Sequence, residues 1–241
     1  MTKKVIEIKN LNYSYPDGTE ALSDISLDVF TEEAVGIIGP NGAGKSTLLL
    51  HLNGILRGNS RIKIFGLEVN DRSLAKIRRK VGLVFQDPDN QLFMPTVFDD
   101  VAFGPINMAL PKNEVELSVK EALREVDMLK VMQRPSHHLS FGEKKSVSIA
   151  TVLSMKPEIL VLDEPSSNLD PRHRRNLINF LKQLKLTKII VTHDLDLVLQ
   201  ICSRLALLDK GKIVATGNTR DILRNKSLLE SHGLEMPNSI L

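Results

Sequence analysis

The sequence predicts an α/β fold with a mostly parallel sheet, an N-terminal antiparallel sheet and a helical insertion. The first observation is a set of continuous apolar runs, which are typical of strands buried on both faces of a parallel sheet. They cover residues 34–38, 81–85, 158–164 and 188–193. The second is a pair of alternating segments near the N-terminus, typical of antiparallel strands. The third is helical spacing of apolar residues between two of these strands.

Composition limits the kinds of protein that this chain can be. Its 241 residues suffice for one large domain or two small ones. The 32 lysines and arginines against 29 aspartates and glutamates give a net charge of only +3, which argues against a nucleic-acid-binding surface. The single cysteine excludes an internal disulfide. The start lacks the apolar core of a secretory signal, and no apolar stretch approaches the ~20 residues that cross a bilayer. We expect a soluble, cytoplasmic protein.

The alternating N-terminal segments are residues 5–9 and 25–29, on either side of a turn at residues 16–18. Both tyrosines of the chain, Tyr13 and Tyr15, lie just before this turn. An aromatic ring in such a loop could stack on a nucleotide base, or it could simply pack against its neighbours. The residues alone favour neither interpretation.

The apolar run at 34–38 leads into a loop that matches G-x-x-x-x-G-K-[ST], the Walker A motif. The loop residues are Gly39, Pro40, Asn41, Gly42, Ala43, Gly44, Lys45, Ser46 and Thr47. Glycine is favoured because backbone N–H groups must approach phosphate oxygens closely, and the following helix adds its partial positive charge. Lys45 can reach the β- and γ-phosphates, and the Ser46 hydroxyl can ligate Mg²⁺. We therefore predict a site for ATP or a similar triphosphate.

The middle of the chain changes from strands to helices. Residues 62–66 are predicted as a strand, and the apolar strand 81–85 ends at Gln86. From 113 to 129, apolar residues recur at helical spacing. Residues 87–150 are therefore predicted as a helical insertion.

The last third of the chain returns to buried strands. The strand predicted at 158–164 ends in two carboxylates, and the strand predicted at 188–193 ends in a histidine. The other predicted elements here are a helix at 171–186, a hairpin of 204–208 with 212–215, and a tail at 221–241 that begins as a helix.

Four polar side chains follow the ends of apolar strands: Gln86, Asp163, Glu164 and His193. Because the carboxyl ends of parallel strands meet at one edge of a sheet, where ligands bind, we expect these side chains to lie together. Asp163 would hold the hydration shell of Mg²⁺, and Gln86 could ligate Mg²⁺ or orient water. Glu164 could polarise the attacking water, and His193 could contact the γ-phosphate. With Lys45, these two are the predicted catalytic residues.

At this point the motifs resemble, in their order along the chain, those of the ABC transporter ATPases. Residues 139–143, Leu-Ser-Phe-Gly-Glu, resemble the LSGGQ signature, and residues 167–170 resemble the D-loop. The resemblance extends through about residue 225. It implies one ATPase domain of the P-loop NTPase (RecA-like) fold. The implied divisions are a nucleotide-binding core of residues 1–86 and 151–220, a helical subdomain of 87–150 that carries the signature, and a C-terminal tail of 221–241.

The resemblance also implies roles for residues that the strand ends do not include. Ser140, Gly142 and Glu143 would contact the γ-phosphate of ATP bound to a partner subunit, and Tyr15 would stack on the base. Phe141 replaces the first signature glycine, and Glu143 replaces the usual glutamine. The hydroxyl of Ser140 and the backbone of Gly142 are retained, so the departures concern closure of the dimer and not ATP binding.

Residues 85–93, 95–97 and 100–105 resemble the energy-coupling-factor (cobalt/nickel-type) ATPases, which drive uptake of cobalt, nickel or vitamins. This resemblance implies a peripheral protein on the cytoplasmic face of the cell membrane. Its partners would be transmembrane transporter subunits, whose coupling helix would dock near residues 87–105. The ATPase would form a homodimer or pair with a paralogous ATPase, and it would not bind nucleic acid.

Two alternatives remain at this point. A soluble ABC ATPase that acts on nucleic acid or ribosomes would usually carry long coiled-coil insertions or two fused halves, which do not fit in 241 residues. A P-loop kinase would need an acceptor pocket in place of the segment that resembles the signature. His137 and His138 are adjacent and not at the spacing of metal ligands, so we predict no separate metal site there.

Overall fold

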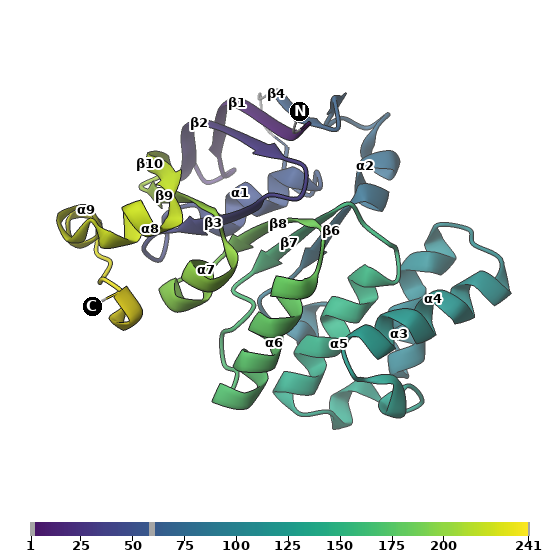
Figure 1. Cartoon of the computed structure of the whole chain (residues 1–241). Coiled ribbons are helices and arrows are strands. Elements are labelled where there is room, and N and C mark those ends of the chain that lie inside the picture. Colours follow the sequence, from purple (N-terminus) through teal and green to yellow (C-terminus); the bar gives the residue numbers. More distant parts are fainter. Residues whose placement is uncertain (1–2, 58–60, 241) are drawn as a thin grey trace.

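A computed structural model describes residues 3–57 and 61–240. Its centre is a six-stranded sheet in which a parallel series is flanked by one antiparallel edge strand, β10 (Figure 1). In spatial order the strands are β10 (Lys212–Asn218), β9 (Arg204–Asp209), β3 (Ala34–Ile38), β8 (Thr187–Val191), β7 (Ile159–Asp163) and β6 (Val81–Val84). The predicted mostly parallel sheet is confirmed.

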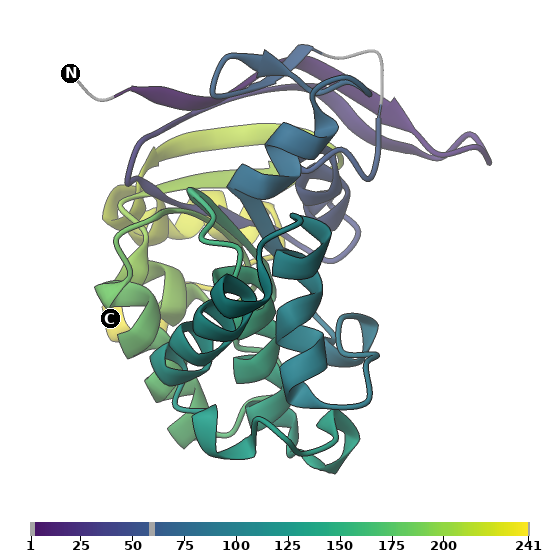
Figure 2. The same cartoon turned by 90° about the vertical axis from the view of Figure 1, so that its right-hand side faces the viewer.

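The predicted N-terminal antiparallel sheet is also present, and it lies above the parallel sheet in Figures 1 and 2. Its strands, in spatial order, are β2 (Glu20–Phe30), β1 (Lys4–Ser14), β4 (Arg61–Ile64) and β5 (Leu67–Glu68). Strands β1 and β2 are longer than the alternating segments predicted, because bulges let the pairing continue past irregular positions.

Alternate side chains of the parallel strands enter two separate cores. Ile159 and Val161 of β7 pack toward the antiparallel sheet and α1 (Lys45–Leu52), whereas Leu160 and Leu162 pack toward the helices on the other face. Because each face of the strand is buried, the sequence of β7 is continuously apolar, as in parallel sheets generally.

The predicted helical insertion contains α3 (Val97–Asn107), α4 (Lys112–Glu125) and α5 (Phe141–Leu153), which pack against one another (Figure 2). The sequence analysis did not identify α3, whose start is marked by Thr96, a cap that accepts a hydrogen bond from the N–H of Asp99. The helix predicted for 113–129 ends earlier, because Asp127 has a left-handed φ of 57° that a helix cannot continue through.

Helix α2 (Leu74–Lys80) lies on the side of the parallel sheet that faces the antiparallel sheet, and its Ile77 belongs to the core between them (Figure 1). The remaining α-helices lie below the parallel sheet or toward the C-terminus (Figure 1), and they are α6 (Pro171–Gln183), α7 (Leu195–Ile201), α8 (Thr219–Arg224) and α9 (Lys226–Ser231). Helix α6 begins as predicted but ends three residues before the predicted residue 186. Within residues 3–57 and 61–240, no helix is both long enough and apolar enough to cross a membrane.

Candidate functional site

The glycine-rich loop of residues 39–47 joins β3 to α1. Gly39 has a φ of 153°, and a Cβ added there would lie 1.9 Å from the carbonyl oxygen of Leu208 in β9. Gly44 has a φ of 99°, and a Cβ there would lie 2.4 Å from the carbonyl oxygen of Ala21 in β2. The loop is therefore packed between two strands so closely that side chains at these positions would collide with backbone.

Lys45 is the first residue of α1 and is only 8% exposed. Its ammonium group turns back across the loop and donates hydrogen bonds to the carbonyl oxygens of Gly39 and Pro40, each over 2.8 Å. Burial lowers the pKa of Lys45, and the negative charges of Glu164 and Asp163 act against that fall. The positive charge is therefore held at the mouth of the loop and faces two carboxylates.

A cavity of about 690 Å³ opens beside this loop. The structure brings most of the candidate site residues together there, although they come from distant parts of the chain. The candidate residues in its lining are Tyr15, the loop residues 39–47, Gln86, Asp163, Glu164 and His193. The side chains at or just after the ends of β6, β7 and β8 thus meet the loop that follows β3 at one edge of the sheet.

Tyr15 lies at the rim of this cavity. Its hydroxyl is 2.9 Å from the Thr47 hydroxyl in α1, and its ring packs edge-to-face on Tyr13 with ring centroids 5.2 Å apart. The side chain is thus fixed on both sides while remaining 36% exposed. One part of the ring surface is free to contact a ligand.

Asp163, the last residue of β7, carries an oxygen, Oδ1, that is buried and has no hydrogen-bond partner within the described part of the chain. Burial raises the pKa of Asp163, and the neighbouring Ser46 hydroxyl acts against that rise. A carboxylate oxygen without a partner, next to a hydroxyl, is a donor set that suits a hard cation such as Mg²⁺. The residues present therefore fit this ion.

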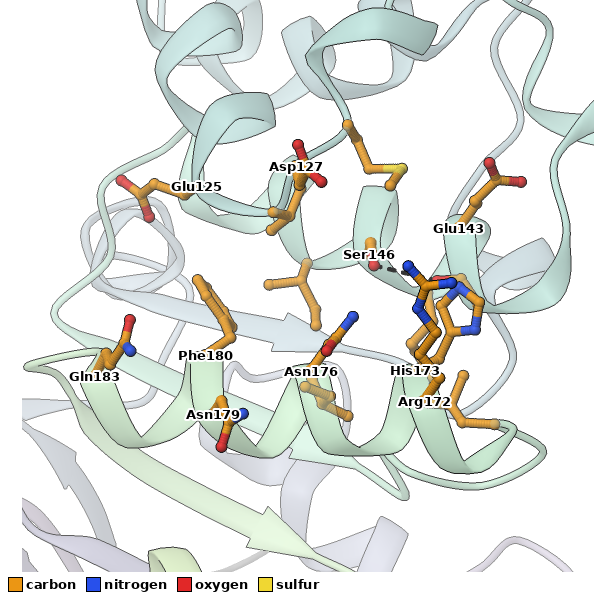
Figure 3. A pocket seen from close by; sticks show the side chains of 17 residues that line it. Glu125, Asp127, Glu143, Ser146, Arg172, His173, Asn176, Asn179, Phe180 and Gln183 are labelled. Atoms are coloured by element: carbon orange, nitrogen blue, oxygen red, sulfur yellow. Dashed lines mark hydrogen bonds between the residues drawn. The ribbon is translucent and has the colours of Figure 1, made fainter.

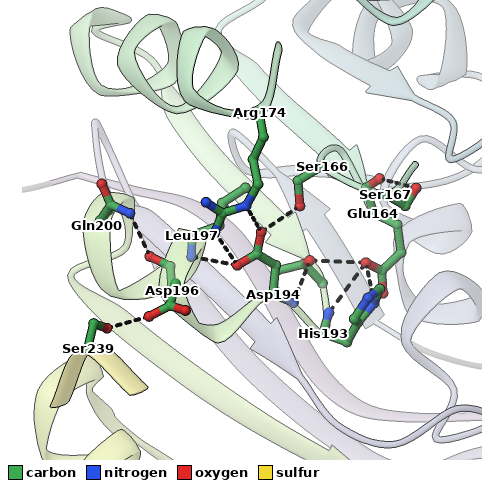
Figure 4. A network of polar contacts seen from close by, with 11 residues as sticks. Glu164, Ser166, Ser167, Arg174, His193, Asp194, Asp196, Leu197, Gln200 and Ser239 are labelled. Atoms are coloured by element: carbon green, nitrogen blue, oxygen red, sulfur yellow. Dashed lines mark hydrogen bonds and ion pairs between the residues drawn. The ribbon is translucent and has the colours of Figure 1, made fainter. Parts of the chain in front are cut away.

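Glu164 has an unusual backbone and a firmly held side chain. Its φ is 43°, in the left-handed region, and the residue is 7% exposed. Its Oε2 accepts hydrogen bonds from the Thr192 hydroxyl over 3.0 Å and from the N–H of His193 over 3.3 Å, and it lies 2.9 Å from Nδ1 of His193 (Figure 4). Left-handed backbone at a non-glycine residue is costly and concentrates at functional sites. Glu164 and His193 therefore form one polar unit at the cavity.

Helix α5 supplies a buried cation that the sequence analysis missed. Lys145 is 1% exposed, and its ammonium group donates hydrogen bonds to the carbonyl oxygens of Gln86 over 2.6 Å and Phe85 over 3.1 Å. Burial lowers the pKa of Lys145 to about 8, while nearby carboxylates oppose the fall. The one available signal was its helical spacing from the apolar Ile149 and Val152. Lys145 ties α5 to the strand end that carries Gln86.

The residues that resemble the signature do not line the cavity beside the loop. Ser140 precedes α5, and its N–H donates to Oε2 of Glu143 over 2.8 Å, while the N–H of Glu143 donates to Oγ of Ser140 over 3.3 Å. These bonds from Ser140 lower the pKa of Glu143. Glutamate in place of glutamine thus completes a capping box at the start of the helix.

Gly142 and Glu143 line a second cavity, of about 550 Å³, between α5 and α6 (Figure 3). The ring of His173 on α6 covers Gly142, since a Cβ added to Gly142 would lie 2.6 Å from two atoms of that ring. The signature-like segment is thus in contact with the helix that follows residues 167–170, and not with the glycine-rich loop of the same chain.

A third cavity, of about 580 Å³, lies beside the segment 87–105. Two of its lining side chains are strongly exposed, Phe93 at 63% and Phe103 at 45%, and their rings meet edge-to-face with centroids 5.1 Å apart. Asp100 of α3 holds the segment by accepting hydrogen bonds from the N–H groups of Phe93 and Met94, each over 2.9 Å. The result is an ordered apolar surface open to solvent.

Comparison with known proteins identifies the family of this chain. A model of the ABC transporter family matches residues 22–167. A putative ABC transporter ATP-binding protein of Geobacter sulfurreducens is 51% identical, over 100% of this chain and 97% of that protein. An energy-coupling factor transporter ATP-binding protein, EcfA, of Carboxydothermus hydrogenoformans is 50% identical, over 96% of this chain and 87% of that protein.

A solved structure shares the fold. The cbiO1 protein of Clostridium perfringens, described as part of the ABC transporter complex cbiONQ, superposes with a TM-score of 0.83. It is 39% identical, and the match covers 95% of this chain and 94% of that one. The agreement between the family model, the relatives and the fold leads to one conclusion: this chain belongs to the ABC transporter family and is one of its ATP-binding proteins.

Proposed function

We propose that this chain binds ATP with Mg²⁺ in the cavity beside residues 39–47, hydrolyses it there, and so energises a membrane importer of the energy-coupling-factor type. The observation that carries the proposal is the convergence of the phosphate-binding loop with Asp163, Glu164 and His193 at one cavity of about 690 Å³. The similarity to EcfA and cbiO1 supports the transport role. The transported substrate would be cobalt or nickel ions or a vitamin.

Binding would use the loop, its lysine and the tyrosine at the rim. The N–H groups of residues 39–47 and the start of α1 would receive the phosphates, and Lys45 would exchange its carbonyl partners for phosphate oxygens. The exposed part of the Tyr15 ring would stack on the base. Ser46, Gln86 and Asp163 would hold Mg²⁺ directly or through water, and that ion would neutralise phosphate charge during hydrolysis.

Hydrolysis would use the unit formed by Glu164 and His193. Glu164 is already hydrogen-bonded through Oε2, which fixes the direction of its carboxylate. We propose that this carboxylate accepts the proton of the attacking water, while His193, whose side chain is 66% exposed, contacts the γ-phosphate. Burial of Glu164 keeps competing solvent away from the carboxylate.

A second subunit would complete the site. The signature-like residues Ser140, Gly142 and Glu143 do not line the cavity beside the glycine-rich loop of their own chain, so we propose that they contact ATP bound to a partner. That partner is a second copy or a paralogous ATPase. The helical subdomain, residues 87–150, would then move relative to the nucleotide-binding core when ATP is bound.

The exposed apolar surface around Phe93 and Phe103 would receive an amphipathic helix of a transmembrane subunit. The protein would then lie at the cytoplasmic face of the membrane. The surface lies next to Gln86 in the chain, so a change at the γ-phosphate could reach the membrane partner over a short distance. The near-neutral charge of the chain, +3, gives no support to the alternative of a nucleic-acid partner.

Replacing Lys45 by alanine tests the binding site. The variant loses a charge-assisted hydrogen bond to phosphate, and such bonds are worth about 1.5–3 kcal/mol, so affinity for ATP should fall about 10- to 100-fold. Titration with a fluorescent ATP analogue measures this change. Lys130→Ala, at an exposed lysine outside the cavity, is the control and should bind normally. Equal affinity of the two variants would contradict the proposed site.

A further inference from the structure

The carboxylate of Asp194 is held by three separate parts of the chain (Figure 4). Arg174 of α6 grips both oxygens, with Nε donating to Oδ2 and a terminal nitrogen donating to Oδ1, each over 2.6 Å. The Ser166 hydroxyl donates to Oδ2 over 2.9 Å, and the N–H of Leu197 donates to Oδ1 over 2.9 Å. A two-pronged arginine contact of this kind fixes both distance and orientation.

The contact is partly shielded from solvent. The side chains of Arg174 and Asp194 are 32% and 16% exposed. Burial by itself would raise the pKa of Asp194, but the hydrogen bonds from Arg174, Leu197 and Ser166 outweigh it and lower the pKa. The aspartate is therefore ionised and fully engaged, unlike the members of a surface ion pair.

Through its own backbone, Asp194 reaches the centre of the site. Its N–H donates to the hydroxyl oxygen of Thr192 over 3.0 Å, and that hydroxyl in turn donates to Oε2 of Glu164 over 3.0 Å. Thr192 is completely buried, so water does not compete for these bonds. His193 lies between Thr192 and Asp194 in the chain and contacts the same oxygen of Glu164. A continuous series of hydrogen bonds thus runs from α6 to the carboxylate of Glu164.

Capping of α7 does not account for this arrangement. Asp194 is the N-cap of that helix, but the cap needs only the bond from Leu197 to Oδ1. Arg174 and Ser166 connect Asp194 to two further segments of the chain, and both segments lie next to proposed functional residues. Ser166 lies two residues after Glu164, and Arg174 lies in the first turn of α6, whose N-cap, Asp170, is the last residue of the D-loop-like segment.

We propose that Arg174 and Asp194 are positioning residues for ATP hydrolysis, which hold His193 and Glu164 in place from α6. This inference rests on the proposed function of the cavity. Neither residue lines the cavity, so both act through Thr192 and His193. A displacement of the start of α6, where a second subunit would press on residues 167–170, would then reach the two catalytic side chains directly.

Steady-state hydrolysis by Arg174→Ala tests the proposal. A misplacement of catalytic groups by about 1 Å can cost ~10²-fold, so kcat should fall about 10- to 100-fold, while KM for ATP stays within about twofold. Arg174→Lys keeps the positive charge but cannot donate from two fixed nitrogens to both oxygens of Asp194. This variant should therefore recover part of kcat. Arg175→Ala, at an exposed neighbour on the same helix, is the matched control and should behave as the unmodified chain.

Measurement of Arg174→Ala in a chain that already carries His193→Ala separates a positioning role of Arg174 from a general loss of structure. In His193→Ala, the loss of single-turnover hydrolysis when Arg174→Ala is added should be smaller than the loss in the unmodified chain, because only the path through Thr192 to Glu164 remains. A full additional loss would overturn the proposal, as would an unchanged kcat in Arg174→Ala. If Arg174→Ala does not fold, unchanged kcat in Arg174→Lys overturns it equally. Absence of hydrolysis by the unmodified chain would instead contradict the proposed function itself.

Discussion

Replacing Glu164 by glutamine is expected to slow ATP hydrolysis by about 10²- to 10⁴-fold while ATP binding stays intact. The amide keeps the size of the side chain and can still accept hydrogen bonds from Thr192 and His193 at one oxygen. It cannot accept a proton from water at neutral pH, so only the chemical step loses its base. Phosphate release and nucleotide titration on the same preparation measure the two quantities separately.

A control for this variant lies at the other end of the same strand. Glu158 directly precedes β7, is paired with Lys80 and lies outside the cavity, so Glu158→Gln removes a carboxylate without touching the site. Its hydrolysis rate should match that of the unmodified chain. A near-normal rate in Glu164→Gln would remove this residue from its proposed role, whatever the binding data show.

Replacing Phe93 by aspartate should abolish docking to the transmembrane subunits and substrate uptake, while the isolated chain folds and binds ATP. The Phe93 side chain is 63% exposed, so its replacement removes few packing contacts from the folded monomer. In the complex, burial of a phenylalanine side chain stabilises binding by about 1.5–3 kcal/mol. An unpaired carboxylate buried in the same apolar surface would add a desolvation cost. Affinity for the partner should therefore fall at least about 10- to 100-fold.

Co-purification with detergent-solubilised partner subunits, and uptake in cells, measure this effect. Leu117→Asp is the matched control, because Leu117 of α4 is 53% exposed and lies outside the cavity beside residues 87–105. It should dock normally. If Phe93→Asp unfolds, the ring belongs to the core of the insertion. If it folds and uptake continues, the docking surface lies elsewhere.

Much of the fold could be predicted because the relevant signals are local. Strands such as β7 are apolar at every residue since both faces are buried, and the turn between β9 and β10 carries its own glycine, Gly211. The loop at 39–47 has a sequence pattern dictated by close backbone packing. By contrast, the apolar residues of α3 show no clear helical spacing, the helix contains Pro105, and turn-forming residues precede it. The sequence therefore did not predict this helix.

The contacts within the site were much harder to predict. Lys145 is bonded to Gln86, which is 59 positions away in the chain, and Arg174 to Asp194, 20 positions away. In the sequence both cations belong to charged runs that are typical of solvated helix faces. Only the packing of α5 and α6 against the parallel sheet decides that Lys145 is buried and that Arg174 is partly buried against Asp194.

The central claim is that each hydrolytic site is completed by a second subunit. The most direct measurement is phosphate release per subunit over a wide range of protein concentration, with molar mass determined by light scattering in the presence of ATP. We predict that the rate per subunit rises with concentration in the dilute range and levels off as the mass reaches that of a dimer with two bound ATP. A rate per subunit that is independent of concentration, from a chain that remains monomeric with ATP, would contradict the claim.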